Sequence, residues 1–590
     1  MKKLILVIFF LFSFSIFAQN KLPDWAKGVV WYQIFPERFA NGDTSNDPEA
    51  QKVFINEKVV PQDWEITKWT SNWFAISDWE KQLSGRNRQL YYDRRYGGDI
   101  QGIIDKLDYL KSLGVGAIYL NPIFEAVSLH KYDGSSYHHI DINFGPDPKG
   151  DKMLMSSETP DDTSTWKWTS ADKLFLKLIQ KVHKRGMKII LDGVFNHTGV
   201  QFWAFQDVVK NQSKSKYADW YIIKKFDDPT TPQNEFEYKG WWGTKSLPEF
   251  NRTKDDLAEG PKEYIFNSTR KWMDPNNDGD PSDGIDGWRL DVAREVPIGF
   301  WKQWQKIVKN INHNSLIVGE LWELSPDFIS VDGPFDALMN YNFAMAVNDL
   351  FIADKDPISV DEFIKRLKTI DTTYPQENLY VLQNLMSSHD TERLSSMILN
   401  PNRKYDYDSN ENNPNYNPGK PSGSVYEKQK LVAAFQLLYR GAPMIYYGDE
   451  VGMWGADDPH CRKPMIWADL KYDNEVIDET SGFKTGFGSY KVAQNIDLLD
   501  FYKRMIKIHN EYQSLQKGSI NFICEDDSKR AFAFERILGT EKIVCAFNLG
   551  ENETSIKLSY KGEEIFPDNG KSFTKEIFLM PNSFKVLLVK

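Results

Sequence analysis

The stretch "ADKLFLKLIQKVHKRGMKIILDGVFNH", residues 171 to 197, contains the repeating unit that decides the fold. Its apolar residues at the spacing of one helical face are Leu174, Leu178 and Val182. Gly186 is placed to end that helix, and the apolar run from Met187 to Leu191 is typical of a buried strand, with Asp192 directly after it. The stretch therefore predicts a helix followed by a buried strand whose carboxyl end carries a carboxylate.

The same order of helix and strand recurs at residues 99 to 122, 300 to 322 and 431 to 450. Apolar runs of strand length occur at Val29 to Phe35, Val115 to Leu120, Met187 to Leu191, Trp288 to Val292, Leu316 to Val318, Phe335 to Met339, Tyr380 to Met386 and Met444 to Tyr447. Eight strands that alternate with helices predict an α/β fold, a closed parallel (β/α)8 TIM barrel. The carboxyl ends of barrel strands converge on one face, where the active site lies.

Carboxylates follow or end several of these strands, namely Asp192, Asp291, Glu320 and Asp390. Three carboxylates at the strand ends of one barrel could be metal ligands, or they could be an acid, a nucleophile and a helper that split a glycosidic bond. His197 and His389 stand beside two of these positions, which keeps a metal centre open, but the chain has no HExxH pair of the kind that hydrolytic zinc sites use. Sugar chemistry is therefore the favoured interpretation.

Arg289 and Asp291 lie two positions apart on one predicted strand, so their side chains point to the same side. The pair could simply neutralise itself in a core. Alternatively, the guanidinium keeps a nucleophilic carboxylate ionised. A retaining glycosidase needs such a carboxylate and, beside it, a carboxylic acid that donates a proton.

Composition excludes some partners. The chain has 590 residues, of which 41% are hydrophobic and 26% charged, enough for a large core and more than one domain. Lys and Arg number 72 against 83 Asp and Glu, a net charge of −11, which argues against nucleic acid and anionic membranes as partners. The 19 Trp and 27 Tyr suit stacking on sugar rings, although most of them will be core residues.

Changes in sequence character predict the domain limits. The catalytic barrel would occupy residues 25 to 196 and 287 to 514, interrupted after the third strand by a small inserted domain at 197 to 286, since a βα connection needs far fewer residues. Residues 515 to 590 alternate in strand fashion between Gly, Asn and Asp turns. They predict a C-terminal antiparallel β-sandwich domain.

The first 18 residues resemble a secretory signal peptide, with Lys2 and Lys3, an apolar run from Leu4 to Phe17, and Ala18 as a cleavage point. The apolar run is shorter than the roughly 20 residues of a spanning helix. No Cys follows Ala18, so we expect no lipid anchor and no stable membrane anchor. The expected location is secreted across the inner membrane, in the periplasm or outside the cell.

Four short motifs occur in order at successive strand ends: "DGVFNH" (192 to 197), "GWRLDVARE" (287 to 295), "GELW" (319 to 322) and "SSHDTER" (387 to 393). With them, nearly the whole chain resembles the α-amylase family of glycoside hydrolases. The resemblance implies that Asp291 is the nucleophile, Glu320 the general acid and then base, and Asp390 the residue that holds sugar hydroxyls. The substrate contacts that it implies are His130, Tyr132, His197, Arg289 and His389.

The resemblance extends to a calcium loop of the neopullulanase and cyclomaltodextrinase branch. Its implied ligands are Asn41, Asp43, Asn46, Asp47, Gly97 and Asp99. Hard oxygen ligands on a tight loop suit calcium, although a polar turn without an ion has the same composition. Glu295 stands where many α-amylases place a histidine ligand of their central calcium, which again favours this branch.

The resemblance predicts a retaining hydrolase of α-1,4-glucosidic bonds in starch, maltooligosaccharides or pullulan. A cyclomaltodextrinase or 4-α-glucanotransferase stays open, and a non-catalytic glucan-binding relative is a third reading. The barrel begins near residue 28, without the amino-terminal β domain through which many cyclomaltodextrinase-like relatives dimerise, so we expect a monomer. Trp241, Trp242 and Trp322 could hold sugars or could simply pack.

Overall fold

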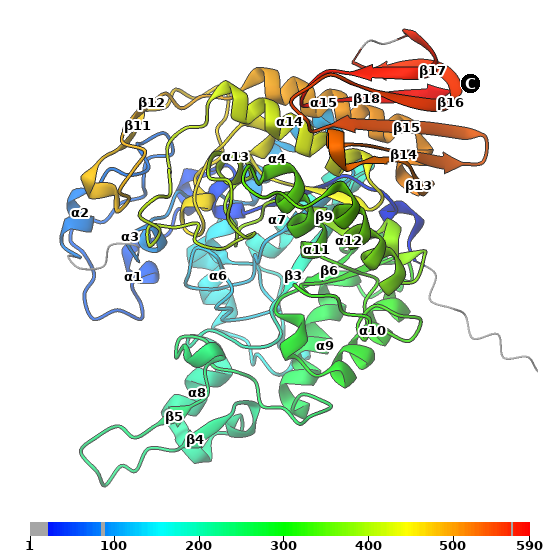
Figure 1. Ribbon diagram of the computed structural model, residues 1–590. Coiled ribbons are helices and arrows are strands. Elements are labelled where there is room, and N and C mark those ends of the chain that lie inside the picture. The colour runs from blue at the N-terminus through cyan, green and yellow to red at the C-terminus, as the bar shows by residue number, and fades with distance from the viewer. Residues whose placement is uncertain (1–21, 84–88, 568–569) are drawn as a thin grey trace, which may run out of the picture.

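Eight parallel strands form the centre of the molecule in the computed structural model, which describes residues 22–83, 89–567 and 570–590 (Figure 1). They are β1 (Trp31–Ile34), β2 (Ala117–Leu120), β3 (Lys188–Gly193), β6 (Gly287–Leu290), β7 (Leu316–Gly319), β8 (Ala337–Leu338), β9 (Gln383–Leu385) and β10 (Ala442–Tyr446). Their order is β8-β7-β6-β3-β2-β1-β10-β9, and a parallel bridge between Met339 and Gln383 joins the two ends of the sheet. The predicted TIM barrel is confirmed.

Helices cover the outside of the barrel. The main ones are α4 (Ile100–Asp105), α5 (Leu107–Leu113), α7 (Ser170–Lys184), α9 (Glu259–Met273), α10 (Ile298–Ile311), α11 (Tyr341–Val347), α12 (Val360–Thr373), α14 (Gly423–Leu438) and α15 (Ile496–Glu511). In α7 the Thr169 side chain accepts a hydrogen bond from the backbone of Asp172 and caps the first turn. Gly186, with φ of +71°, then turns the chain into β3, as the sequence predicts.

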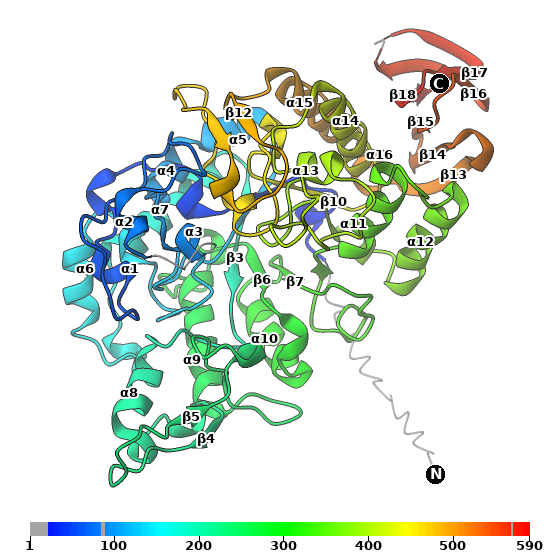
Figure 2. The same ribbon diagram turned by 60° about the vertical axis from the view of Figure 1, so that its left-hand side comes forward.

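The segment after β3 projects from the barrel (Figures 1 and 2). It contains α8 (Trp203–Asn211), β4 (Ile223–Lys225) and β5 (Glu237–Tyr238). The next helix, α9, packs on α10 instead, since the Trp304 indole donates to Thr269 Oγ1 at 2.8 Å and the rings of Phe266 and Phe300 stack. Residues 259 to 273 of the expected insertion therefore form a barrel helix, and the projecting part is shorter.

Shorter helices lie in the loops near the barrel mouth. They are α1 (Ala50–Val53), α2 (Asp78–Lys81), α3 (Gln89–Asp93), α6 (Pro148–Met155) and α13 (Leu394–Leu399). A two-stranded hairpin of β11 (Glu475–Ile477) and β12 (Gly488–Tyr490) follows β10. The expected signal peptide lies outside the described residues. Among those residues, none of the helices has the length and apolar character needed to cross a membrane.

The C-terminal domain is antiparallel, as predicted, and its strands form one continuous sheet. They are β13 (Ser519–Asp526), β14 (Ala531–Leu538), β15 (Glu541–Asn548), β16 (Thr554–Phe566), β17 (Ser572–Leu579) and β18 (Ser583–Val589), after the short α16 (Gln513–Lys517). Phe532 and Phe547 on one face pack against Phe435 of α14, which fixes the sheet to the barrel. A second apolar core includes Val544 and Ile556, and the pairing of β16 with β17 contains a register shift.

Candidate active site

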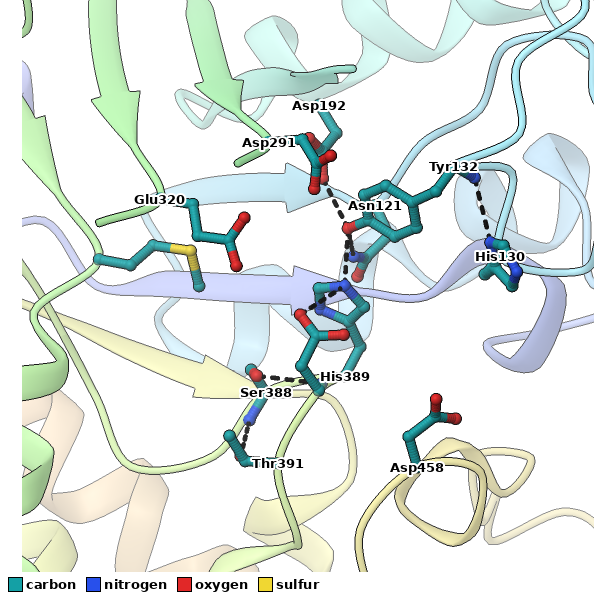
Figure 3. A network of polar contacts seen from close by, with 12 residues as sticks. Asn121, His130, Tyr132, Asp192, Asp291, Glu320, Ser388, His389, Thr391 and Asp458 are labelled. Atoms are coloured by element: carbon teal, nitrogen blue, oxygen red, sulfur yellow. Dashed lines mark hydrogen bonds and ion pairs between the residues drawn. The ribbon is translucent and has the colours of Figure 1, made fainter. Parts of the chain in front are cut away.

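Arg289 is the centre of a carboxylate cluster at the mouth of the barrel. Its side chain is fully buried on β6, and its guanidinium lies 2.9 Å from Asp192, 3.1 Å from Asp291 and 3.0 Å from Glu320. These carboxylates come from the ends of the neighbouring strands β3, β6 and β7 (Figure 3). The structure thus brings the predicted nucleophile and the predicted acid to the same guanidinium.

Burial controls protonation in this cluster. Desolvation and the neighbouring Glu320 raise the pKa of Asp291 well above its ordinary value, while Arg289 acts in the opposite direction. Glu320 is held by two further donors, the backbone N–H of Val292 at 2.9 Å and the Trp322 indole at 3.2 Å. Carboxyl groups that share one guanidinium in a buried pocket favour a state in which the cluster retains a proton. Glycoside cleavage with retention needs an ionised nucleophile and a proton on the acid, so Arg289, which lowers the pKa of Asp291, favours the state that the reaction requires.

Tyr132 and His389 form the floor of the site beside this cluster (Figure 3). Their rings are nearly parallel, with centroids 5.3 Å apart, and the Tyr132 hydroxyl lies 2.6 Å from His389 Nε2 and 2.9 Å from Asp192. The Gln33 amide N–H₂ faces His389 Nδ1 at 3.0 Å, so Nδ1 accepts and Nε2 carries the proton. Burial also lowers the pKa of His389 well below its ordinary value, which keeps the ring neutral.

Asp390 follows His389 and is partly open to the barrel mouth. Its carboxylate contacts Arg462 at 3.2 Å and His389 Nε2 at 3.1 Å. Desolvation raises the pKa of Asp390 to about 7, Arg462 lowers it, and Glu320 adds to the increase. Asp390 is therefore electrostatically linked to the Arg289 cluster.

His130 and His197 lie at the rim. His130 Nδ1 accepts from the backbone of Tyr132 at 3.2 Å and positions that residue. The His197 ring stacks on Trp241 with centroids 5.3 Å apart, and burial lowers the pKa of His197 to about 3. Its Nδ1 lies 3.1 Å from the Asn196 amide nitrogen, and its Nε2 has no partner in the part of the chain that the structure describes. A neutral His197 thus has an N–H left for a ligand hydroxyl.

Several residues of this network were not assigned from sequence. Tyr119 donates to Asp192 at 2.6 Å, and Asn121 donates to the Tyr132 hydroxyl at 3.0 Å. Both come from β2 or directly after it, so the strand-end rule could have found Asn121. Arg462 lies in a loop after β10 where no sequence pattern indicates its contact with Asp390.

The expected calcium ligands gather in one loop region, where Asp99 has a structural role. Its carboxylate accepts from Gly102 N–H at 2.6 Å as the cap of α4, from Gly42 and Asp43 N–H at 3.1 and 2.9 Å, and from the Asn46 amide at 2.9 Å. It thereby ties the loop to α4.

The remaining groups of this region fit a hard cation. Asn41 Oδ1 and Asn46 Oδ1 are buried without a hydrogen-bond partner among the described residues. Burial raises the pKa of Asp47 to about 6, and Asp99, Glu37 and Asp43 add to that increase. Orphaned amide oxygens beside an excess of carboxylates are the donor set that calcium prefers.

A second cluster of potential metal ligands consists of His138, His139 and Glu158. His139 bridges Asp172 and Glu158 with contacts of 2.8 Å each, and His138 contacts the Tyr264 hydroxyl at 2.6 Å. Hydrogen bonds and charge pairs thus satisfy these groups without an ion.

The barrel and the Arg289 cluster define a class of protein, the glycoside hydrolases that act with paired carboxylates. The model of the alpha-amylase catalytic domain matches residues 33–160 and 168–518, and the chain belongs to this family. Neopullulanase 2 of Thermoactinomyces vulgaris is 34% identical over 533 residues, 90% of this chain and 71% of the relative. A cyclomaltodextrinase of Geobacillus thermopakistaniensis is 32% identical over 536 residues, 91% and 71% of the two chains. The chain thus belongs to the neopullulanase and cyclomaltodextrinase-like branch.

Solved structures agree with this assignment. The cyclic alpha-maltosyl-(1→6)-maltose hydrolase from Arthrobacter globiformis matches with a TM-score of 0.69 and 27% identity, over 97% of this chain and 100% of that one. The type III pullulan hydrolase from Thermococcus kodakarensis matches with a TM-score of 0.72 and 26% identity, over 97% and 83%.

Proposed function

We propose that this protein is a retaining hydrolase of α-1,4-glucosidic bonds in starch fragments, maltooligosaccharides or pullulan. The observation that carries the proposal is the buried Arg289 guanidinium, which binds the carboxylates of Asp291 and Glu320 at the carboxyl ends of adjacent strands. The relatives named above, a neopullulanase and a cyclomaltodextrinase, support α-glucans as the substrate class.

The roles follow from the geometry. Asp291 attacks the anomeric carbon and forms a glycosyl-enzyme, while Glu320 donates its proton to the departing oxygen. Glu320 then takes a proton from the water that hydrolyses the intermediate. Asp390, held by Arg462, accepts hydrogen bonds from sugar hydroxyls, and the Tyr132 ring lies beneath the sugar.

Two further parts of the proposal concern calcium and location. Calcium would be held by oxygens of the loop that contains Asn41, Asn46, Asp47 and Gly97, and it would stabilise the loop without entering the reaction. The N-terminal apolar segment supports secretion into the periplasm or medium, and fractionation of cells that express the full chain would test it.

The second candidate is a cyclomaltodextrinase or 4-α-glucanotransferase. The named cyclomaltodextrinase relative favours the first of these. A transferase would use the same carboxylates, but a sugar hydroxyl rather than water would resolve the intermediate.

The experiment compares the wild type with Asp291→Asn on amylose, pullulan and a cyclodextrin. We expect reducing ends to rise with the wild type and the rate to fall by at least about 1,000-fold in the variant, because an amide is a poor nucleophile. Asp327→Asn, an exposed position in the loop after β7, is the control. Redistributed chain lengths without new reducing ends would favour the transferase, and wild-type rates in Asp291→Asn would exclude the assigned nucleophile.

A further inference from the structure

A pocket lies between the loop that joins β1 to α4 and the β11–β12 hairpin. Its walls include Trp69, Ser71 and Trp73 of that loop and Trp454, Lys463 and Glu475 of the segment after β10. The N–H of Val476 donates to Asn72 Oδ1 at 3.0 Å and joins the two segments. The pocket and the solvent at its mouth enclose about 430 Å³, which is within the range of small-molecule sites. None of the four carboxylates of the candidate active site lines this pocket, so it is a separate place.

Hydrogen bonds hold the aromatic walls of the pocket in place. The Trp69 indole, which is only partly buried, donates to the carbonyl of Met465 at 3.0 Å. The Tyr472 hydroxyl donates to the same carbonyl at 3.1 Å and accepts from the N–H of Trp467 at 2.7 Å. Both rings are therefore fixed in the free protein, and a ligand that packs on them costs little side-chain entropy.

A buried ion pair forms the polar wall of the pocket. Lys463 Nζ lies 2.6 Å from Glu475 Oε1, and the two side chains are only 8% and 5% exposed. The Trp454 indole donates to the same oxygen at 3.1 Å, whereas Glu475 Oε2 accepts no hydrogen bond from the described residues. The Lys463 ammonium has three donors, and its other contacts are with the rings of Phe74 and Trp454. The pair thus keeps an acceptor and donors for a bound molecule.

The charge of this wall selects the class of ligand. Lys463 and Glu475 neutralise each other, so a charged ligand would leave an uncompensated charge in a buried place. A purely apolar ligand would leave the free carboxylate oxygen and the ammonium donors without partners. A neutral sugar avoids both costs, because adjacent hydroxyls donate to a carboxylate and accept from an ammonium while the C–H faces pack on aromatic rings.

A second hollow continues the pocket along the surface. The two share Ile466, Tyr472 and Val492 as walls. The second hollow runs past Leu470 and Ile496, which are 42% and 55% exposed. A ligand with several sugar units therefore has a place for the units that follow the first.

From these observations, and resting on the proposed function, we propose that this pocket is a second carbohydrate-binding site of the protein, apart from the barrel mouth. One glucose unit of an α-glucan chain would lie between the Lys463–Glu475 pair and the rings of Trp69 and Tyr472, and the next units would lie in the adjoining hollow. A long substrate would be held at this site and at the active site together, whereas a short one would occupy only one of them.

The test measures binding without turnover, by calorimetry of maltoheptaose on Asp291→Asn. Ser71→Trp, added to this background, fills the pocket with an indole and should remove one of two binding sites. Trp69→Ala, which removes a wall, should raise the Kd of that site at least about tenfold. Ser112→Trp is the matched control and should keep both sites. The hydroxyls of Ser71 and Ser112 each donate to the carbonyl three residues earlier at 2.8 Å, but Ser112 is an exposed residue of α5.

Turnover gives a second readout. In otherwise active enzyme, Ser71→Trp should raise the apparent KM for amylose at least about threefold, because a chain held at two sites binds more tightly, and should leave turnover of 4-nitrophenyl α-maltoside within about twofold. Equal maltoheptaose binding with and without Ser71→Trp would overturn the second site, even if the wild type hydrolyses α-glucans. Binding that Ser71→Trp removes from a protein that hydrolyses no α-glucan would keep the second site and refute the proposed function.

Discussion

At the scale of single residues, the distribution of hydrogen bonds within the Arg289 cluster separates the two carboxyl groups that would react. Arg289 binds both Asp291 and Glu320, but only Glu320 also accepts from Val292 N–H and the Trp322 indole. In the free enzyme Glu320 is therefore anchored at a defined place, and Asp291 has one guanidinium contact. The group that must attack is the less restrained of the two.

The role of Glu320 can be tested through the leaving group. Glu320→Gln should lower kcat on maltooligosaccharides by at least about 100-fold, because an alkoxide leaves poorly without a proton. On 4-nitrophenyl α-maltoside, whose leaving group needs little protonation, the loss in the glycosylation step should be far smaller. Glu323→Gln, three residues on and 61% exposed, should behave as the wild type on both substrates. Equal losses of Glu320→Gln on the two would refute the acid role.

Sequence reasoning reached the residues whose place is determined by a strand. Asp291, Glu320 and Asp390 follow buried strands, and barrel topology then brings them to one face. Arg462 was missed because its contact depends on how a loop after β10 folds back. The exposure of Trp242 could not be predicted from sequence either, since tryptophan rarely adopts the left-handed backbone conformation that it has here.

At the scale of elements, the loop that joins β1 to α4 depends on Gly97. Its φ is +74°, and a Cβ added there would lie 2.0 Å from Asp47 Oδ1 and 2.4 Å from the Asn41 amide nitrogen. No other residue type fits this place without moving the groups proposed to hold calcium.

In the wild type, EDTA should lower Tm and added calcium should restore it. Gly97→Ala should have a Tm that is lower by several degrees and that no longer changes with calcium. Gly186→Ala is a matched control, because Gly186 also has a positive φ, +71°, but a Cβ there meets nothing within 4 Å. That variant should lose some stability and keep its calcium response. A wild type whose Tm ignores both EDTA and calcium would exclude the proposed ion.

The end of the inserted segment shows a different limit of sequence reasoning. Helix α9 carries Lys262, Asn267, Ser268 and Thr269 among its apolar residues, so its helical pattern is weak. Nevertheless Thr269 is buried and accepts from the Trp304 indole. The contact with α10, which is absent from the local sequence, makes α9 a barrel helix.

At the scale of the whole molecule, a buried carboxyl couples stability to pH. Glu450 is fully buried and accepts from the hydroxyls of Tyr32 and Tyr109 at 2.8 and 2.6 Å. Burial raises the pKa of Glu450 from 4.5 to about 7. The folded protein thus binds the proton more tightly than the unfolded chain does, so this contribution is complete below about pH 4.5 and is lost as the pH rises to about 7.

Between pH 4.5 and 7, the titration of Glu450 should lower the free energy of unfolding of the wild type by about 3 kcal/mol. Glu450→Gln does not titrate, so this part of the decrease should be absent in the variant. The measurement compares Tm at several pH values for the wild type, Glu450→Gln and the control Glu427→Gln, whose side chain is 68% exposed on α14. Parallel pH profiles for the wild type and Glu450→Gln would contradict this assignment.

The closure of the barrel between β8 and β9 also separates Asp390 from the pair Asp291 and Glu320. A single bridge between Met339 and Gln383, with the Asn340 N–H donating to Gln383 at 2.8 Å, joins β8 to β9, whereas β6 and β7 are paired along their whole length. Asp291 and Glu320 stand on that continuous arc, and Asp390 stands beyond the seam. A small displacement between β8 and β9 would therefore move Asp390 relative to Asp291 and Glu320. It would leave the geometry within that pair unchanged.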